Sequence, residues 1–338
     1  EELYGIGQNG FSEIFSTYTG VNASNDISEK EILENQHLMH GSGVALGDVN
    51  GDELIDIYIP RIKEDNVLYI NKGEWQFEDF TLAAGVAAPN RYSNGSVFAD
   101  VDGDRDLDLI VTALGGPNSV FINDGNGIFV EKKLESKLNN PGSTSSALAD
   151  VDNDGDLDLY ITNYKRKAMR DSLPPPAISF DNTLYESPDG KWGVVPPFNR
   201  EYEAEVKGDK LFRFEFGEVD QFYFNDGKGN FNLIDITKEN FYSVDGGPID
   251  NHLRDWGLVA QFRDMNNDGH PDIYICNDFE SPDRIWINNG DGSFSEIEKT
   301  AVRHTSNSSM SVDFSDLNKD GYVDFFVSDM LSQSHIMK

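Results

Sequence analysis

The stretch Asp150-Val-Asp-Asn-Asp-Gly-Asp-Leu-Asp158, followed at once by Leu159-Tyr-Ile, decides the expected fold. Its carboxylates stand at loop positions 1, 3, 5 and 9, which are Asp150, Asp152, Asp154 and Asp158. Gly155 at position 6 permits the sharp turn that points these oxygens at one centre. Ca²⁺ takes about six to eight hard oxygen ligands, and the backbone carbonyl at position 7 would supply another. The stretch therefore predicts a calcium loop that leads into a β-strand.

Four further loops carry the same spacing of side-chain oxygens. Their ligand positions are Asp48, Asn50, Asp52 and Asp56; Asp100, Asp102, Asp104 and Asp108; Asp264, Asn266, Asp268 and Asp272; and Asp316, Asn318, Asp320 and Asp324. The loops begin at residues 48, 100, 150, 264 and 316, so the first Asp recurs after 52, 50, 114 and 52 residues. Such a period is typical of stacked or radial repeat architectures. The longest interval indicates one repeat plus an insertion.

Two better-known calcium motifs do not fit these loops. An EF-hand needs a bidentate Glu at position 12 and flanking helices, and a dockerin-like loop also has an acid near that position. Position 12 is apolar in every copy: Ile59, Val111, Ile161, Ile275 and Val327. The loops are therefore expected to join two strands and to hold up to five structural Ca²⁺ ions. The alternative explanation, that Asp and Asn only favour turns, does not account for five loops with the same spacing.

The amino-acid composition argues against some classes of binding partner. The 338 residues carry a formal net charge of −33, which argues against nucleic acid and against an anionic membrane surface. Cys276 is the lone cysteine, so it is expected to be buried as a small hydrophobic residue. No apolar run is long enough to span a membrane. Calcium loops of modest affinity fill outside the cytoplasm, and the chain starts at Glu1, so we expect a processed, exported protein, extracellular or periplasmic.

Each repeat holds four short apolar segments that are expected to pair as antiparallel strands. In the first repeat these segments are 44–46, 57–59, 66–71 and 75–78. Four such strands form one blade of a β-propeller, so the sequence predicts an all-β fold with a calcium loop between the first two strands of each blade. Residues 1–338 are expected to form a single propeller.

The ends of the chain and one insertion depart from the regular repeat. Half a repeat stands at each end, the first with an Asn9-Gly10 hairpin signal. The halves either close a five-bladed ring or belong to a larger propeller; the second is favoured because 332–338 reads as an interrupted connection. Residues 165–216 interrupt the third repeat. They are expected to carry a hairpin, to pack against a propeller face and to offer a functional surface.

These motifs resemble a known family. The loop, its strand and a following Leu-Tyr/Phe-x-Asn-x-Gly-x-Gly-x-Phe resemble the FG-GAP/VCBS repeats of integrin-α-type β-propellers. Asp255-Trp-Gly-Leu and Phe326-Val-Ser-Asp-Met-Leu further resemble the ASPIC/UnbV group. The resemblance covers residues 43–330 nearly throughout. It implies an exported calcium-binding adhesion or surface module, with ligand roles at the loop positions named above. Glu53 and Arg105 replace the Gly of position 6, which puts the turn geometry of loops one and two in question.

Three functions remain open at this point. The favoured one is a calcium-binding module that displays a binding, adhesion or structural surface to a protein or glycan partner. The alternatives are a self-assembling surface or filament subunit and a carbohydrate-active enzyme. Catalysis is not expected, because no acid pair stands in a recognisable catalytic setting. His37 and His40 accompany no nucleophile motif, so they are expected to have ordinary packing roles.

Overall fold

The computed structural model describes residues 13–138, 141–249, 253–278, 281–298, 300–302, 304–306 and 308–330. The predicted all-β class with four-stranded antiparallel sheets is confirmed. Helices within the described ranges are short, and none of them is long and apolar enough to cross a membrane. The C-terminal segment 332–338 and the Asn9-Gly10 hairpin signal lie outside the described residues.

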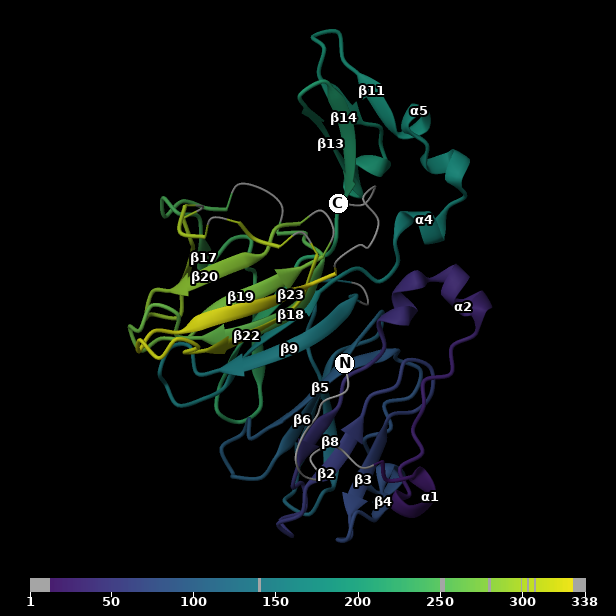
Figure 1. Ribbon diagram of the computed structural model, residues 1–338, viewed down its shortest axis with the longest axis vertical. Helices are drawn as coiled ribbons and strands as arrows, with labels where there is room; N and C mark the ends of the chain where they lie inside the picture. Colours follow the sequence, from purple (N-terminus) through teal and green to yellow (C-terminus); the bar gives the residue numbers. More distant parts are fainter. Residues whose placement is uncertain are drawn as a thin grey trace, which may run out of the picture.

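The first two repeats each form one antiparallel sheet in simple chain order (Figure 1). The first sheet consists of β1 (Ala45–Gly47), β2 (Asp56–Ile59), β3 (Val67–Asn71) and β4 (Phe77–Asp79), and α3 (Thr81–Ala84) follows it. The second consists of β5 (Ser93–Ala99), β6 (Asp108–Ala113), β7 (Ser119–Asn123) and β8 (Phe129–Lys133). The last Asp of each calcium-loop motif is thus the first residue of the second strand.

The third and fourth repeats also form four antiparallel strands, with one extra strand in the fourth sheet, and the last described sheet has two strands. The third sheet contains β9 (Ser143–Ala149), β10 (Asp158–Asn163), β15 (Gln221–Asn225) and β16 (Phe231–Ile234). The fourth contains β18 (Gly257–Arg263), β19 (Asp272–Asn277), β20 (Arg284–Asn288) and β21 (Phe294–Glu296). A fifth strand, β17 (Phe241–Tyr242), pairs in parallel with β21, which the sequence pattern did not predict. The last described sheet has two strands, β22 (Ser309–Ser315) and β23 (Asp324–Asp329).

The sheets follow one another around an arc. Their first strands lie side by side in the order β1, β5, β9, β18 and β22. Each joint between neighbouring sheets uses equivalent residues. Tyr58 of β2 packs in one cluster with Leu109 and Val111 of the next sheet, and Tyr160 packs in the same way with Ile273 and Ile275. The hydrophobic core is therefore divided into layers between sheets.

The outer face of the last described sheet lacks such a neighbour. In the first four sheets, the residue two places after the position-9 Asp of the loop is buried. These residues are Tyr58, Ile110, Tyr160 and Tyr274, each at most 1% exposed. Phe326 at the same place is 67% exposed, and Leu317 at loop position 2 is 68% exposed. At the opposite end of the arc, Leu46 is also exposed. Both end faces thus present apolar side chains to solvent.

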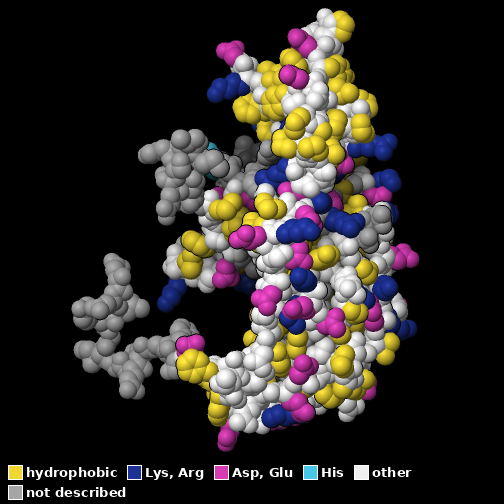
Figure 2. All heavy atoms as spheres, turned by 90° about the vertical axis from the view of Figure 1, so that its right-hand side faces the viewer, with side chains coloured by type: hydrophobic (Ala, Val, Ile, Leu, Met, Phe, Trp, Pro, Cys, Tyr) yellow, Lys and Arg dark blue, Asp and Glu magenta, His cyan; other side chains and the backbone are white. Residues whose placement is uncertain are grey.

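The connection from β10 to β15 projects away from the sheets (Figure 1). It contains α4 (Met169–Ser172), η2 (Pro175–Ile178), α5 (Phe180–Thr183), β11 (Leu184–Glu186), β12 (Trp192–Val194), η3 (Phe198–Arg200), β13 (Tyr202–Lys207) and β14 (Lys210–Glu215). One hairpin was expected, whereas β11 pairs with β12 and β13 pairs with β14. The buried Lys165 anchors the base, because its Nζ lies 2.9 Å from Glu201 Oε2 and 2.8 Å from Glu215 Oε1. Figure 2 shows hydrophobic side chains gathered over this projection.

The segment before the first repeat contains α1 (Ser16–Thr19), α2 (Glu29–Glu34) and the 3-10 helix η1 (Gln36–His40). Ser28 and Glu31 form a capping box that fixes the start of α2. Asn35 caps η1 by accepting a hydrogen bond from the backbone N–H of His37. Residues of η1 line one cleft together with residues of the first strands β5, β9, β18 and β22.

Candidate functional site

The acidic loops all adopt a common hydrogen-bonded turn. In every loop the carboxylate at position 1 accepts a hydrogen bond from the backbone N–H of position 6, at 2.7–3.0 Å. The pairs are Glu53 N to Asp48, Arg105 N to Asp100, Gly155 N to Asp150, Gly269 N to Asp264 and Gly321 N to Asp316. The carboxylate at position 5 accepts the N–H of position 7, as from Asp156 N to Asp154 at 3.0 Å. These bonds hold the carboxylates of positions 1 and 5 against the backbone of the loop.

The carboxylate at position 9 has a second structural role that spacing alone did not predict. Asp158 is buried, and it accepts the N–H of Val151 in its own loop at 3.2 Å and the N–H of Asn225 in the third strand at 2.9 Å. Asp56, Asp108 and Asp272 make the equivalent pair of bonds. This residue therefore ties the loop to two neighbouring strands.

Loops two and three each bring three carboxylates together. Carboxylate oxygens of Asp100, Asp102 and Asp108 lie within 4.8 Å of one another, and so do those of Asp150, Asp152 and Asp154. Loops one, four and five have Asn at position 3, and its Nδ2 donates to the position-5 carboxylate at 2.9–3.1 Å. An amide can turn its oxygen towards a cation instead. Three of the four predicted side chains therefore converge in loop two and three of four in loop three, and the ligand sets of the other loops stay predictions.

The electrostatics of loop two fit a cation. Burial and the neighbouring carboxylates raise the pKa of Asp106 to about 7, and burial raises the pKa of Asp108 to about 6. Asp102 Oδ1 and Asp106 Oδ1 are buried without a hydrogen-bond partner among the described residues. A divalent cation with oxygen ligands would relieve both conditions. Asp106, at position 7, was not predicted as a ligand; the alternation of Asp from residue 100 to 108 is the signal that could have identified it.

The replacement of Gly at position 6 leaves the turn intact but strained. Glu53 and Arg105 have φ angles of 67° and 78°, in the left-handed region where Gly155 has a φ of 98°. Residues with a Cβ adopt this region at a cost of about 1 kcal/mol or more. The turn geometry that was in question is therefore retained at the expense of backbone strain.

Arg105→Gly and Glu53→Gly are each expected to stabilise the chain by about 1 kcal/mol, because Gly adopts the left-handed conformation without strain. The measurement is the urea midpoint of unfolding with chelator present, so that calcium affinity does not contribute. The matched control is Gly155→Arg, where an added Cβ would meet no atom within 4 Å and only the backbone cost remains. Equal midpoints for all three variants and the parent would contradict the strain.

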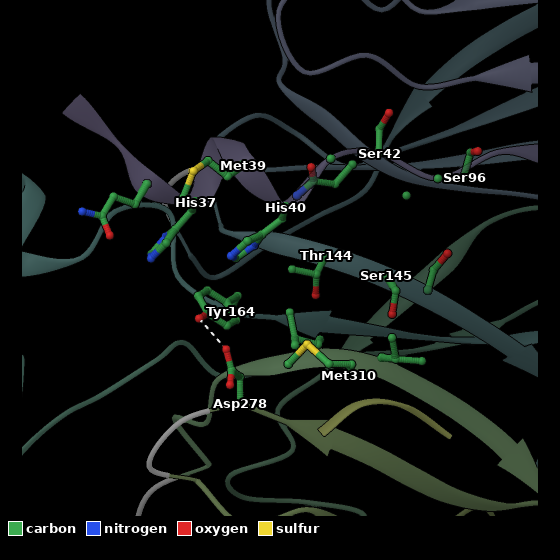
Figure 3. A pocket seen from close by; sticks show the side chains of 18 of the residues that line it. His37, Met39, His40, Ser42, Ser96, Thr144, Ser145, Tyr164, Asp278 and Met310 are labelled. Atoms are coloured by element: carbon green, nitrogen blue, oxygen red, sulfur yellow. Dashed lines mark hydrogen bonds between the residues drawn. The ribbon is translucent and has the colours of Figure 1, made fainter. Parts of the chain in front are cut away.

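A second candidate site lies at the centre of the arc (Figure 3). It is a cleft of about 750 Å³ formed by residues 36–44 and by the strands β5, β9, β18 and β22. The hydroxyl of Tyr164 donates to Asp278 Oδ2 at 3.0 Å, and the ring of His37 stands edge-on to Tyr164 with centroids 4.9 Å apart. His37 and His40 stack with centroids 5.5 Å apart. The two histidines, expected to have packing roles, therefore also line a cleft.

Comparison with known proteins agrees with the repeat geometry. The model of the FG-GAP-like repeat matches residues 48–111, 100–161 and 264–327, which confirms the repeat resemblance. Cartilage acidic protein 1 of Homo sapiens is 28% identical over 82 residues, which are 24% of this chain and 12% of that protein. The chain therefore matches only a small part of this relative's length.

Solved structures are similar at low identity. A lectin of Agrocybe aegerita that recognises non-reducing terminal N-acetylglucosamine is 17% identical, with 84% of this chain and 74% of the lectin covered and a TM-score of 0.31. The GH43_1 enzyme of Xanthomonas citri, complexed with xylotriose, is 13% identical over 83% of both chains, with a TM-score of 0.35.

The prediction that the chain is not an enzyme is contradicted, because these similar structures include GH43_1 enzymes. The reasoning from the sequence relied on the absence of a recognisable acid pair in local motifs. One scaffold of sheets can carry binding sites or catalytic sites that are assembled from distant residues, so that absence did not exclude catalysis. At this level of identity the likeness concerns the fold and transfers no catalytic residue to this chain.

Proposed function

The chain belongs to the FG-GAP-like repeat family, and on that premise we propose that it is a calcium-binding β-propeller module that acts outside the cytoplasm. The observation that carries the proposal is the convergence of carboxylates in loops two and three, each with oxygens within 4.8 Å of one another. Uncompensated carboxylates at such distances repel, and Ca²⁺ is the abundant extracellular cation that takes these ligands.

Calcium has a structural role in this proposal. Ca²⁺ in each loop would neutralise the carboxylates at positions 1 and 5, and at position 3 in loops two and three, and would fix the turn between the first two strands of a blade. The first strands lie side by side along the arc and the second strands form the joints between sheets, so the ion would stabilise the blade stack as a whole. With a net charge of −33, the compact chain also gains from bound divalent cations through reduced self-repulsion.

In this proposal the blades belong to a single propeller unit, interrupted by the 165–216 insertion. The exposed Phe326 and Leu317 support an arc that a further blade would continue, in preference to a ring of five. This favours the larger of the two propellers considered from the sequence.

The module would act by rigid display of a surface to a protein or glycan partner. The projecting insertion is the surface that best suits this role, because it exposes several large apolar side chains, namely Phe180, Tyr185, Trp192, Val206 and Phe212. Clustered apolar side chains of this kind mark interaction sites more often than solvated surface. Figure 2 shows hydrophobic side chains gathered at this end of the molecule.

Isothermal titration with Ca²⁺ tests the calcium proposal. Affinity rises with the number of charged ligands, so loops two and three, with Asp at position 3, should bind more tightly than loops one, four and five. Two tight sites and a weaker set are expected. Asp102→Asn should move one site from the tight set to the weak set, with a loss of roughly tenfold in affinity.

The matched control for this titration is Asn266→Asp, which should move a site of loop four in the opposite direction. A titration without saturable heat, or Asp102→Asn and Asn266→Asp variants that leave both classes of site unchanged, would contradict the assignment of these loops.

A further inference from the structure

We propose that Asn50, at position 3 of loop one, is a site of spontaneous self-modification, in which its side-chain amide becomes a carboxylate through a cyclic imide. Gly51 follows it, and Asn is one of the chemically labile residues of proteins. Glycine has no Cβ to hinder the approach of its backbone nitrogen to the preceding side chain. The inference uses only groups of this chain and water, so it does not depend on the calcium proposal.

The hydrogen bonds of loop one bring the reacting groups together. The backbone N–H of Asp52 donates to Asn50 Oδ1 at 3.1 Å, and this turn folds the amide back over the peptide bond that joins Asn50 to Gly51. The N–H of Gly51 in turn donates to Asp48 Oδ1 at 2.8 Å. Groups held next to each other in this way react without the entropic cost of an encounter.

The first step closes the ring and releases ammonia. The Gly51 nitrogen attacks Asn50 Cγ, and its proton passes along the existing hydrogen bond to the Asp48 carboxylate, which acts as a general base. The negative charge that develops on Asn50 Oδ1 is stabilised by the Asp52 N–H, in the manner of an oxyanion hole. The carbonyl then re-forms as the Cγ–Nδ2 bond breaks, and the proton held by Asp48 leaves with that nitrogen as ammonia.

Water completes the conversion in the second step. It adds to either carbonyl of the imide and breaks that carbonyl's bond to the Gly51 nitrogen, which gives aspartate at position 50 or isoaspartate with a longer backbone. Gly51 is exposed, and a Cβ in its place would meet no atom within 4 Å, so water reaches the site.

The aspartate product would make loop one resemble loop two. Residues 48–52 would then read Asp-Val-Asp-Gly-Asp, which is the sequence of residues 100–104. For this consequence alone the inference rests on the proposed function, because the new carboxylate would add a charged calcium ligand to loop one. The isoaspartate product would instead alter the spacing between the ligand positions of the loop.

The other Asn-Gly pairs within the described ranges begin at residues 94, 126 and 289, and their glycine N–H groups meet uncharged acceptors. Gly95 donates to Thr112 Oγ1, Gly127 to Asn123 Oδ1 and Gly290 to Asn288 Oδ1. Loop one differs because its glycine N–H meets a carboxylate. Asn50 is therefore expected to react ahead of the exposed Asn126 and Asn289.

Loop four has the same turn without the reactive pair. Asn266 Oδ1 accepts the N–H of Asp268 at 2.9 Å, but the residue that follows it is Asn267. Asn267 has a φ of 61° and Gly51 a φ of 74°, so position 4 has similar backbone conformations in the two loops. Exchanging the residues at position 4 therefore moves the Asn-Gly pair from one loop to the other.

Peptide mass mapping of the full chain tests the inference. The protein is incubated in chelator, well below its midpoint of unfolding, and in parallel in urea. In urea the Asn-Gly pairs at 50, 126 and 289 should convert at similar rates. In the folded protein Asn50 should convert at least about tenfold faster than Asn126 and Asn289. Both aspartate and isoaspartate should form at position 50, because direct hydrolysis of the amide gives aspartate alone.

Three variants separate the geometry from the mere presence of Asn. Gly51→Asn should slow the conversion of Asn50 by at least about tenfold, because a Cβ then hinders the attacking nitrogen. Asn267→Gly should make Asn266 reactive, at roughly the rate of Asn50 in the parent. Asp48→Asn keeps an acceptor but removes the base, so it should slow the conversion of Asn50 by at least about tenfold.

Several outcomes would overturn the inference. These are a folded protein in which Asn50 converts no faster than Asn126 and Asn289, a product without isoaspartate, an Asn267→Gly variant whose Asn266 stays unreactive, and an Asp48→Asn variant that converts at the parent's rate. The readout is a mass obtained without calcium. A negative result would therefore leave the calcium titration unaffected, and a failed titration would leave the conversion of Asn50 unaffected.

Discussion

Removal of calcium with a chelator is expected to lower the thermal midpoint of unfolding by about 10–20 °C. A ligand at one hundred times its Kd stabilises the native state by about 2.7 kcal/mol per site, so the two loops with converged carboxylates would contribute about 5 kcal/mol. For a chain of this size, each kcal/mol corresponds to about 2–4 °C. Without the ion, the carboxylates of each loop also repel one another across the turn.

Two controls make this result specific to the loops. Magnesium at the same concentration should restore little of the midpoint, because it requires a tighter octahedral shell and dehydrates reluctantly. Added monovalent salt should restore only the part that comes from general charge repulsion. A midpoint that is the same in calcium and in chelator would show that the loops are solvated turns, whatever their geometry.

Asp158→Ala is expected to destabilise the chain by about 2–6 kcal/mol even in chelator, because two buried backbone N–H groups lose their acceptor. These donors belong to Val151 and Asn225. By contrast, Asp152→Ala at position 3 should matter little in chelator and should act only when calcium is present. The measurement is the urea unfolding free energy of both variants under the two conditions.

The last loop supplies the matched control for this prediction. Asp324 accepts a backbone N–H from Leu317, and the described part of its sheet ends at β23, with no third strand to donate a second bond. Asp324→Ala should therefore cost clearly less than Asp158→Ala. If position 3 and position 9 variants were equally destabilising in chelator, the distinction between ligand and strand-tying roles would be lost.

The repeat structure could be predicted because its signals are local. Strands β2 and β3 fall on the predicted segments 57–59 and 66–71 to within one residue, since apolar residues and turn residues identify both. The burial of Cys276 within β19 was also correct. The parallel strand β17 was missed, because its pairing with β21 depends on a contact between segments about 50 residues apart.

The candidate sites were predictable only in part, for the same physical reason. The spacing of Asp and Asn identifies the loops, but the double role of Asp158 depends on the backbone of a strand 67 residues away. The cleft was missed entirely. His37 and Asn94 come from separate segments, and only the fold brings them to one cleft.

The exposed face around Phe326 has a consequence for how such chains grow over evolutionary time. Every internal joint uses an aromatic or aliphatic residue two places after the loop, set against aliphatic residues of the following sheet. Phe326 and Val327 reproduce both halves of that pattern. Because successive joints are chemically interchangeable, duplication of one repeat in the gene would insert a blade with complementary surfaces already present. The calcium loop would be copied with it, so each added blade would bring its own means of stabilisation.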